Sequence, residues 1–230
     1  TLYSRHYDAA DAARFESDLR EKEWVVLLRD AIDGEVRGFS TQTIFEHADP
    51  RGARVRVLFS GDTIIDPEYW GEQELVRGWC RFAGRALAEE PQTPFYWLLI
   101  SKGHRTYLYL PLFFRDYWPR YESAATPFQS GLLASVARRR FGACFDAGSG
   151  LLRFPASLGQ LKPGLAEVPP GRRDDPRVKY FLERNPRYAQ GEELVCLAPI
   201  SPENMRAIAA RSLQEGLRLG PLRARFLSRP

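Results

Sequence analysis

Two periodicities of apolar residues divide the first half of this chain into strands and helices. The run WVVLLRD, residues 24–30, is apolar at nearly every position and predicts a strand, and Asp33-Gly34 after it is a hairpin turn signal. The partner strand is GEVRGFSTQTIFE, and a third strand, ARVRVLFSGDTIID, contains Gly61 in its interior. A lone glycine inside a strand predicts a β-bulge or the close approach of another backbone.

Beyond this third strand the period changes. From Glu72 to Glu89 apolar residues recur about every 3.6 residues, which predicts an amphipathic helix. The following segment, PFYWLLIS, is apolar at nearly every position, as in a central strand covered on both faces. The aromatic-rich segment HRTYLYLPLFFRDYWPRY predicts another helix, which Pro111 either kinks or begins.

The second half of the chain contains clear helix start signals. The capping box TPFQ at 126–129 predicts one helix, and Asp175-Pro176 begins a shorter one. The run ELVCLAPI predicts a late strand, and the final helix is predicted to begin at Ser201 and to end at Gly216. With a helix near the N-terminus, these elements predict one mixed α/β domain over residues 1–230 around a central sheet, with an insertion at about 120–176.

Composition supports a folded domain. Hydrophobic residues make up 44% of the chain and aromatic residues 13%, which is ample for a buried core. The three cysteines, Cys80, Cys144 and Cys196, are far apart and have neither CxxC spacing nor histidines at zinc-ligand spacing. We therefore expect neither a disulfide framework nor a metal site, and a reducing cytoplasm as the location.

The charge pattern argues against two classes of partner. The net charge is only +4, and the basic cluster at 138–140 and the basic C-terminal tail are typical of solvated faces, so we expect no nucleic-acid partner. The longest apolar run stops at Lys102, too short for a transmembrane helix, so we expect no membrane span.

The stretch IIDPEYWGEQEL joins the third strand to the amphipathic helix. The N-terminus of a helix offers unpaired N–H groups and a partial positive charge, which suit a phosphate or diphosphate. Ile65, Pro67, Tyr69 and Gly71 also match the pattern Val-x-Pro-x-Tyr-Arg-Gly-x-Gly-x-Gly/Ala. This pattern and the order of helix, apolar strand and helix after it resemble the GNAT superfamily of N-acyltransferases over roughly residues 24–118.

The resemblance implies a fold and an activity. It implies a central, mostly antiparallel sheet with one splayed parallel pair and helices on both faces, the late strand serving as the last strand. It also implies transfer of an acyl group from a thioester, acyl-coenzyme A (acyl-CoA) or an acyl carrier protein, to an amine of a small molecule or conjugate, without a metal. It assigns the pantetheine arm of the thioester carrier to Thr63, Ile64 and Ile65. It assigns the phosphates to Tyr69, Trp70, Gly71 and Gln73.

The chain departs from the GNAT pattern in this loop. Trp70 replaces the usual Arg or Gln, Gln73 replaces a motif glycine, and Glu72 and Glu74 place negative charge where an anion would bind. Three interpretations follow: coenzyme A binds differently, the acyl group arrives on a carrier protein, or the loop binds nothing. In the last case the chain is a non-catalytic GNAT-fold binding module that has lost coenzyme A binding.

The catalytic candidates come from the same region. Asp62 beside the predicted bulge has no evident structural role, so it is a candidate base for the amine, as is His104 at a strand-to-helix junction, where a capping role fits equally well. GNAT enzymes often use a tyrosine on the last core helix to protonate the departing thiolate. Phe114 aligns with that tyrosine, and Tyr107 is the candidate acid, with Tyr109 and Tyr117 nearby. For each tyrosine, packing in the core is the alternative role.

Overall fold

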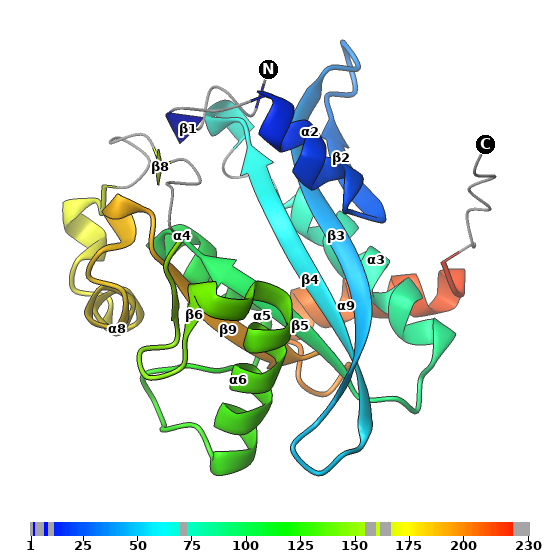
Figure 1. The fold of residues 1–230 in the computed structure, drawn as a ribbon. Coiled ribbons are helices and arrows are strands. Elements are labelled where there is room, and N and C mark those ends of the chain that lie inside the picture. The colour runs from blue at the N-terminus through cyan, green and yellow to red at the C-terminus, as the bar shows by residue number, and fades with distance from the viewer. Residues whose placement is uncertain are drawn as a thin grey trace.

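The structure, a computed structural model, describes residue 2 and residues 7–8, 12–69, 73–154, 160–161 and 167–222 (Figure 1). The α-helices are α2 (Ala12–Arg20), α3 (Glu74–Glu89), α4 (His104–Tyr107), α5 (Tyr109–Phe113), α6 (Pro127–Phe141), α8 (Pro176–Arg184) and α9 (Ala207–Leu219). The strands are β1 (Tyr7–Asp8), β2 (Trp24–Arg29), β3 (Val36–Ala48), β4 (Arg54–Ile65), β5 (Phe95–Ser101), β6 (Phe145–Asp146), β7 (Leu151–Leu152), β8 (Gln160–Leu161) and β9 (Glu193–Pro199).

One seven-stranded sheet organises the molecule. Its strand order is β2-β3-β4-β5-β9-β7-β6, and β1 and β8 pair separately. The pair β4–β5 is parallel, and the other neighbouring pairs are antiparallel. The prediction of a mixed α/β fold with a mostly antiparallel sheet and one parallel pair is therefore confirmed.

A bulge interrupts β4 at the glycine that the sequence singled out. Ser60 pairs with Gln42 and Thr63 pairs with Ser40, so Gly61 and one further β4 residue face a single residue of β3. A Cβ atom on Gly61 would lie 2.7 Å from the Thr41 hydroxyl. The predicted bulge is therefore confirmed, and a glycine fits because the opposing side chain crowds the backbone.

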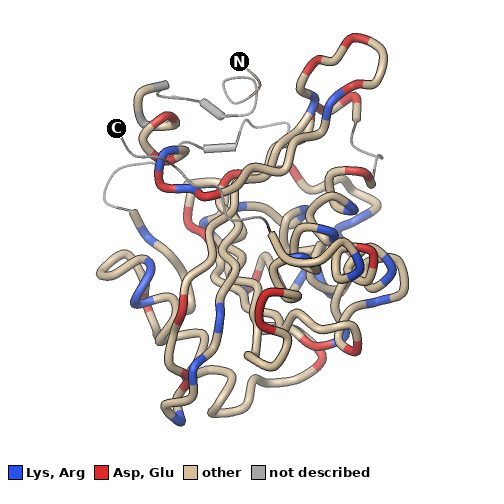
Figure 2. The backbone as a smooth tube through the Cα atoms, turned by 90° about the vertical axis from the view of Figure 1, so that its right-hand side faces the viewer, with Lys and Arg blue, Asp and Glu red and all other residues tan. Residues whose placement is uncertain are grey.

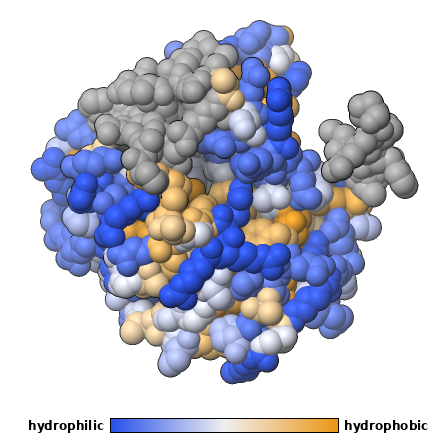
Figure 3. Space-filling view, in the orientation of Figure 1, coloured by the Kyte–Doolittle hydropathy of each residue, from blue (hydrophilic) through white to orange (hydrophobic). Residues whose placement is uncertain are grey.

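Helices cover both faces of the sheet. Figure 1 shows α6 in front of the sheet and α3 and α9 behind it. On the α3 face, Trp79 and Leu213 pack in one core with Trp97 of β5. On the α6 face, Leu132 and Val136 pack in a second core. Apolar residues also reach the surface near the middle of the face in Figure 3, bordered by hydrophilic ones.

The expected insertion, about 120–176, supplies part of this architecture. It begins α6 with the predicted capping box, in which Thr126 accepts from the Gln129 backbone N–H and the Gln129 side chain accepts from Thr126 N–H. The same segment supplies β6 and β7 to the edge of the sheet. Residues of this segment therefore help to close the α6 face.

Charged residues are spread along the chain. Figure 2 shows basic and acidic residues interspersed over most of the tube. The basic cluster at the end of α6 is partly engaged: Arg139 lies 5.7 Å over the Phe45 ring, and Arg140 lies 5.0 Å over Phe59 and pairs with Glu21 at 3.6 Å. These arginines thus help attach α6 to its neighbours.

The final helix differs from the prediction at both ends. It begins at Ala207 rather than near Ser201, and Gly216 lies inside it instead of ending it. A Cβ atom on Gly216 would lie 2.1 Å from the backbone oxygen of Arg81 in α3. Gly216 therefore lets α3 and α9 approach closely. The sequence alone does not distinguish a glycine at such a helix–helix contact from one that ends a helix.

The aromatic segment after β5 is also less helical than predicted. It forms two short helices that meet at Leu108, with Pro111 inside the second, and the helical part ends at Phe113. Beyond it, Phe114 bridges Met205 and Trp118 bridges Leu197. Pairing with the chain around β9 replaces the expected last helical turns.

Candidate functional site

The parallel pair β4–β5 separates beyond the bulge. Its ladder joins residues from Arg56 to Ser60 with those from Phe95 to Leu99, and both strands continue past it, to Ile65 and Ser101. A narrow space, the β4–β5 slot, opens here on the α3 face and holds about 40 Å³. It is lined by Ser40, Ser60, Thr63, Ile65, Leu75, Val76, Trp79, Trp97, Leu99, Thr106, Tyr109 and Phe113.

A buried chain of hydrogen bonds forms the floor of the slot. The Ser60 hydroxyl accepts from the indole N–H groups of Trp79 at 3.1 Å and Trp97 at 2.8 Å. Ser60 donates to Gln42 Oε1 at 2.7 Å, and Gln42 Nε2 donates to the Ser40 hydroxyl at 2.7 Å. Because buried polar groups are costly unless paired, this chain fixes the side chains at the inner end of the slot.

Thr63 connects this chain to the slot. Its hydroxyl lies 2.7 Å from the Ser40 hydroxyl. Ile65, on the same strand, lines the slot, whereas Ile64 is buried and pairs with Phe39. Of the three residues predicted to hold the pantetheine arm, two therefore face the slot, and the third contributes its backbone to β4.

Two carboxyl groups with perturbed acidity lie near the bulge. Burial raises the pKa of Asp62, and the nearby Lys22 and Lys102 oppose that rise. Burial also raises the pKa of Glu193, whose carboxylate lies 3.4 Å from the Lys102 ammonium. Asp62 is half-buried and is not among the residues that line the slot. Its raised pKa makes it a better proton acceptor than an exposed carboxylate, and its place beside the bulge keeps it a candidate base.

The loop between β4 and α3 is attached to the β2–β3 hairpin. The Tyr69 hydroxyl donates to Asp30, and the Arg37 guanidinium lies 5.5 Å over the Tyr69 ring. The Tyr69 side chain is thus engaged with the hairpin. The predicted phosphate contacts Trp70 and Gly71 lie outside the described residues.

The start of α3 is open to solvent. Gln73 is exposed at the N-cap and makes no side-chain capping bond. Glu74 is exposed and pairs with Arg77 at 2.6 Å. This outward ion pair reduces the repulsion that Glu74 would exert on an anion at the helix N-terminus.

His104 begins α4 and is only 2% exposed. Burial first, and then the charges of Arg105 and Arg172, lower its pKa to about 4. The ring is therefore neutral near neutral pH and a weaker base than an ordinary histidine. Gly103, rather than His104, occupies the N-cap of α4.

The tyrosine that reaches the slot is Tyr109. Tyr107 is fully buried, and its hydroxyl donates to the Pro119 carbonyl at 3.0 Å. Tyr109 lines the slot and stacks on Phe113 with 5.6 Å between ring centroids. The break at Leu108 separates Tyr107 from Tyr109. Pro111 indicated a kink or a new helix start, but the pattern did not show which tyrosine would face the slot.

Other chemistry finds little support in the described part of the chain. Burial raises the pKa of Cys80 to about 12, so this thiol is not ionised near neutral pH. The described residues contain no cluster of three or more His, Cys, Asp or Glu side chains suited to a metal ion. Within the same residues, we find no helix with the length and apolar character needed to cross a membrane.

The sequence analysis missed the polar chain under the slot. Ser40 and Gln42 lie next to each other on one face of β3, and Ser60 lies opposite Gln42 on β4. Polar residues at buried strand positions are a signal for a hydrogen-bonded network. Comparisons with protein-family models, curated proteins and solved structures found no match. Function therefore has to be inferred from the residues and their geometry.

Proposed function

We propose that this protein moves an acyl group from a thioester, acyl-CoA or an acyl carrier protein, to an amine of a small molecule or conjugate. The observation that carries this proposal is the end of the β4–β5 ladder at Ser60 and Leu99, directly beside the bulge. Separation of two parallel strands exposes backbone amides to an extended arm, as pantetheine requires. The resemblance to GNAT enzymes, whose sheet contains such a splayed pair, supports the same function.

The transfer assigns a task to each group near the slot. The pantetheine arm lies along β4 at Thr63–Ile65 and hydrogen-bonds to its backbone. The amine nitrogen attacks the thioester carbonyl, the C–S bond breaks, and the nitrogen loses a proton to Asp62. The departing thiolate takes a proton from the Tyr109 hydroxyl, the role for which Tyr107 was the sequence candidate. His104, which is buried and does not line the slot, is the weaker of the two candidate bases.

The small volume of the slot favours a second candidate function. About 40 Å³ holds only a few non-hydrogen atoms, far less than a typical ligand pocket. Acyl transfer then requires Phe113 and other apolar residues around the slot to move when the carrier binds, while Tyr109 stays at the slot. If these apolar residues stay in place, the chain is a non-catalytic binding module that has lost coenzyme A binding.

Calorimetry and a transfer assay separate the two. Acetyl-, malonyl- and long-chain acyl-CoA are titrated into the protein, and the same thioesters and a loaded carrier protein are incubated with a panel of amines. We expect that at least one thioester binds and that an amide is formed. Both should be lost in Thr106→Trp, because the new side chain fills the slot. Ala134→Trp, on α6 and outside the slot, is the matched control and retains both.

A substitution of the candidate base refines the test. Asp62→Asn preserves size but removes the proton acceptor, so we expect thioester binding to persist while the transfer rate falls at least about 100-fold. No binding by any thioester, together with no acylation from the loaded carrier, would contradict the enzyme proposal and leave the binding module.

A further inference from the structure

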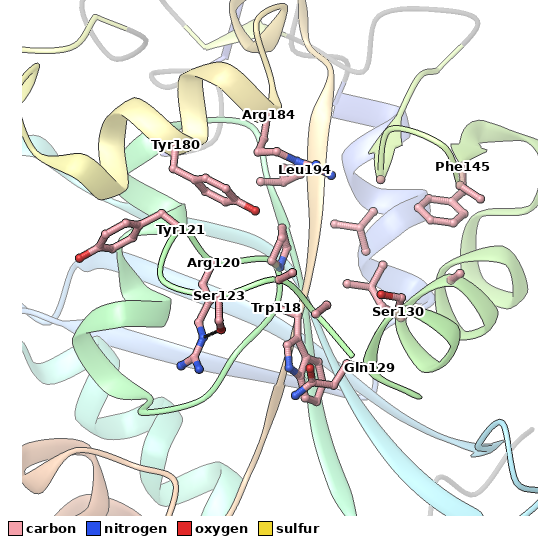
Figure 4. A pocket seen from close by; sticks show the side chains of 18 residues that line it. Trp118, Arg120, Tyr121, Ser123, Gln129, Ser130, Phe145, Tyr180, Arg184 and Leu194 are labelled. Carbon is pink, nitrogen blue, oxygen red and sulfur yellow. Dashed lines mark hydrogen bonds between the residues drawn. The ribbon is translucent and has the colours of Figure 1, made fainter. Parts of the chain in front are cut away.

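A much larger cavity lies at the outer edge of β9, between α6, α8 and the segment 118–125 (Figure 4). We call it the edge pocket, and it holds about 460 Å³, which is within the size range of small-molecule sites. No sequence motif pointed to it. Its lining comes from segments distant in the sequence, including Trp118, Ser130, Phe145 and Tyr180.

The charged groups of the edge pocket are of one sign. Among the described residues that line it, Arg120 and Arg184 are the charged ones. Arg120 is engaged, because its guanidinium donates to the Arg115 carbonyl at 2.8 Å and lies 3.6 Å from Asp116. Arg184 is exposed and donates to the Ser149 carbonyl at 2.9 Å, and among the described residues no carboxylate forms a salt bridge with it. A guanidinium without a carboxylate partner favours an anionic ligand.

A buried donor in the lining also lacks a partner. The Trp118 side chain is 5% exposed, and its indole N–H has no acceptor among the described residues. The indole nitrogen has almost no accessible surface, so a ligand in the edge pocket would contact the Trp118 ring rather than its N–H. Figure 4 shows Tyr180 and Arg184 projecting from α8 toward the same cavity.

Much of the remaining lining is apolar, and Ser123, Gln129 and Ser130 are its small or amide polar residues. Leu133 and Ala134 of α6, Phe145 of β6 and Val195 of β9 form one side of the edge pocket. The pocket therefore presents a hydrocarbon and aromatic surface together with the Arg184 guanidinium. Such a combination fits a molecule with an apolar body and one anionic end.

We propose that the edge pocket binds an apolar or aromatic monocarboxylate. The carboxylate accepts from the Arg184 guanidinium, and the apolar body packs against Leu133 and Phe145. This inference does not depend on acyl transfer, because none of the lining residues of the edge pocket lines the β4–β5 slot.

Three matched probes test the assignment: 4-phenylbutyrate, its neutral amide and 4-phenylbutylamine. Titration followed by NMR of the indole N–H signals reports both affinity and place, and Trp118→Phe identifies the signal of Trp118. We expect the carboxylate to bind about tenfold more tightly than the amide, the amine not to bind, and the Trp118 signal to shift.

Variants locate the site. Arg184→Gln is expected to weaken 4-phenylbutyrate about tenfold and to leave the amide unchanged. Ala134→Trp fills the cavity and abolishes binding of both, whereas Thr106→Trp, in the slot, leaves binding intact. Ser130→Trp, at an exposed position of α6, is the second blocking variant if Ala134→Trp does not fold.

Three results would overturn the inference. These are no binding of 4-phenylbutyrate at millimolar concentration, equal affinity for the carboxylate and the amide, and binding that persists in a folded blocking variant. Because Thr106→Trp blocks only the slot and Ala134→Trp only the edge pocket, failure of this inference is distinguishable from failure of the proposed acyl transfer.

Discussion

The β4–β5 slot and the edge pocket are built in opposite ways. The slot holds about 40 Å³, lies over a buried hydrogen-bond chain, and comes from one stretch of β-strands and helices between Ser40 and Phe113. The edge pocket holds about 460 Å³ and is assembled from segments around Trp118, α6, β6, α8 and β9. The difference shows that a backbone feature with a local cause can be read from sequence, whereas a cavity made by distant segments cannot.

The two regions should also respond differently to substitution. The floor of the slot consists of buried side chains whose polar atoms bond to one another. Much of the edge pocket is lined by exposed or half-buried residues such as Ser130 and Arg184. We therefore expect changes around the slot to reduce the free energy of unfolding and changes in the edge pocket to alter ligand binding alone.

The largest effect is expected at the contact that holds α3, one wall of the slot, against α9. In Gly216→Ala the new Cβ would meet the Arg81 carbonyl oxygen at 2.1 Å, so the helices must move apart. We expect a loss of about 3 kcal/mol in the free energy of unfolding, measured by urea denaturation.

Gly171→Ala is the control for this change, because a Cβ there meets no atom within 4 Å. Its free energy of unfolding should change by less than about 0.5 kcal/mol. Equal stability of Gly216→Ala and the wild type would show that α3 and α9 do not pack as described.

The second effect is a pH dependence from His104, which begins the helical segment beside the slot. Burial lowers its pKa in the folded state to about 4, below the value of 6.5 in an unfolded chain. The unfolded state therefore binds the proton first, so stability is full above about pH 6.5 and is lost as the pH falls toward 4. The loss reaches at most about 3 kcal/mol.

Urea denaturation at several pH values checks this effect, with His104→Gln as the comparison. The free energy of unfolding of the wild type minus that of His104→Gln should fall as the pH falls from 7 to 4.5, because only the wild type loses the contribution of His104. A difference that does not change over this range would contradict a lowered pKa for His104. Asp62 and Glu193 titrate in both proteins, so their contributions cancel in the difference.

A smaller effect is expected when the same change, serine to alanine, is made in each of the two regions. Ser60→Ala removes the acceptor of two buried indole N–H groups, of which Trp79 also has Gln42 Oε1 at 3.3 Å. We expect a loss of about 2 kcal/mol in the free energy of unfolding. Ser130→Ala in the edge pocket should change it by less than about 0.5 kcal/mol. Similar losses at both positions would show that the polar chain does not stabilise the slot.

The sequence predicted features with local causes. Gly61 marked the bulge, the Thr126–Gln129 box marked the start of α6, and Asp33-Gly34 marked the hairpin. It failed where distant contacts decide the structure. Gly216 looked like a helix end because its contact with Arg81 is invisible in the sequence, and the expected long helix after β5 stops where Phe114 meets Met205.

In the candidate site, too, the sequence predicted the features with local causes and missed those set by distant contacts. Thr63 and Ile65 do line the slot, because strand alternation and the bulge place them there. The choice between Tyr107 and Tyr109 depends on the residue at which the break between α4 and α5 falls. Pro111 indicated a kink or a helix start but did not fix that residue. Trp118, Phe145 and Arg184 line the same pocket only because the tertiary structure brings their segments together.

Hydrogen–deuterium exchange on the intact protein tests the central claim most directly. Saturating acyl-CoA or a loaded carrier protein should slow exchange at the backbone amides of residues 61–66, where the pantetheine arm would bond to β4. Exchange at residues 118–125 beside the edge pocket should not change. Unchanged exchange at 61–66 with every thioester, or slowing confined to 118–125, would contradict a thioester site in the β4–β5 slot.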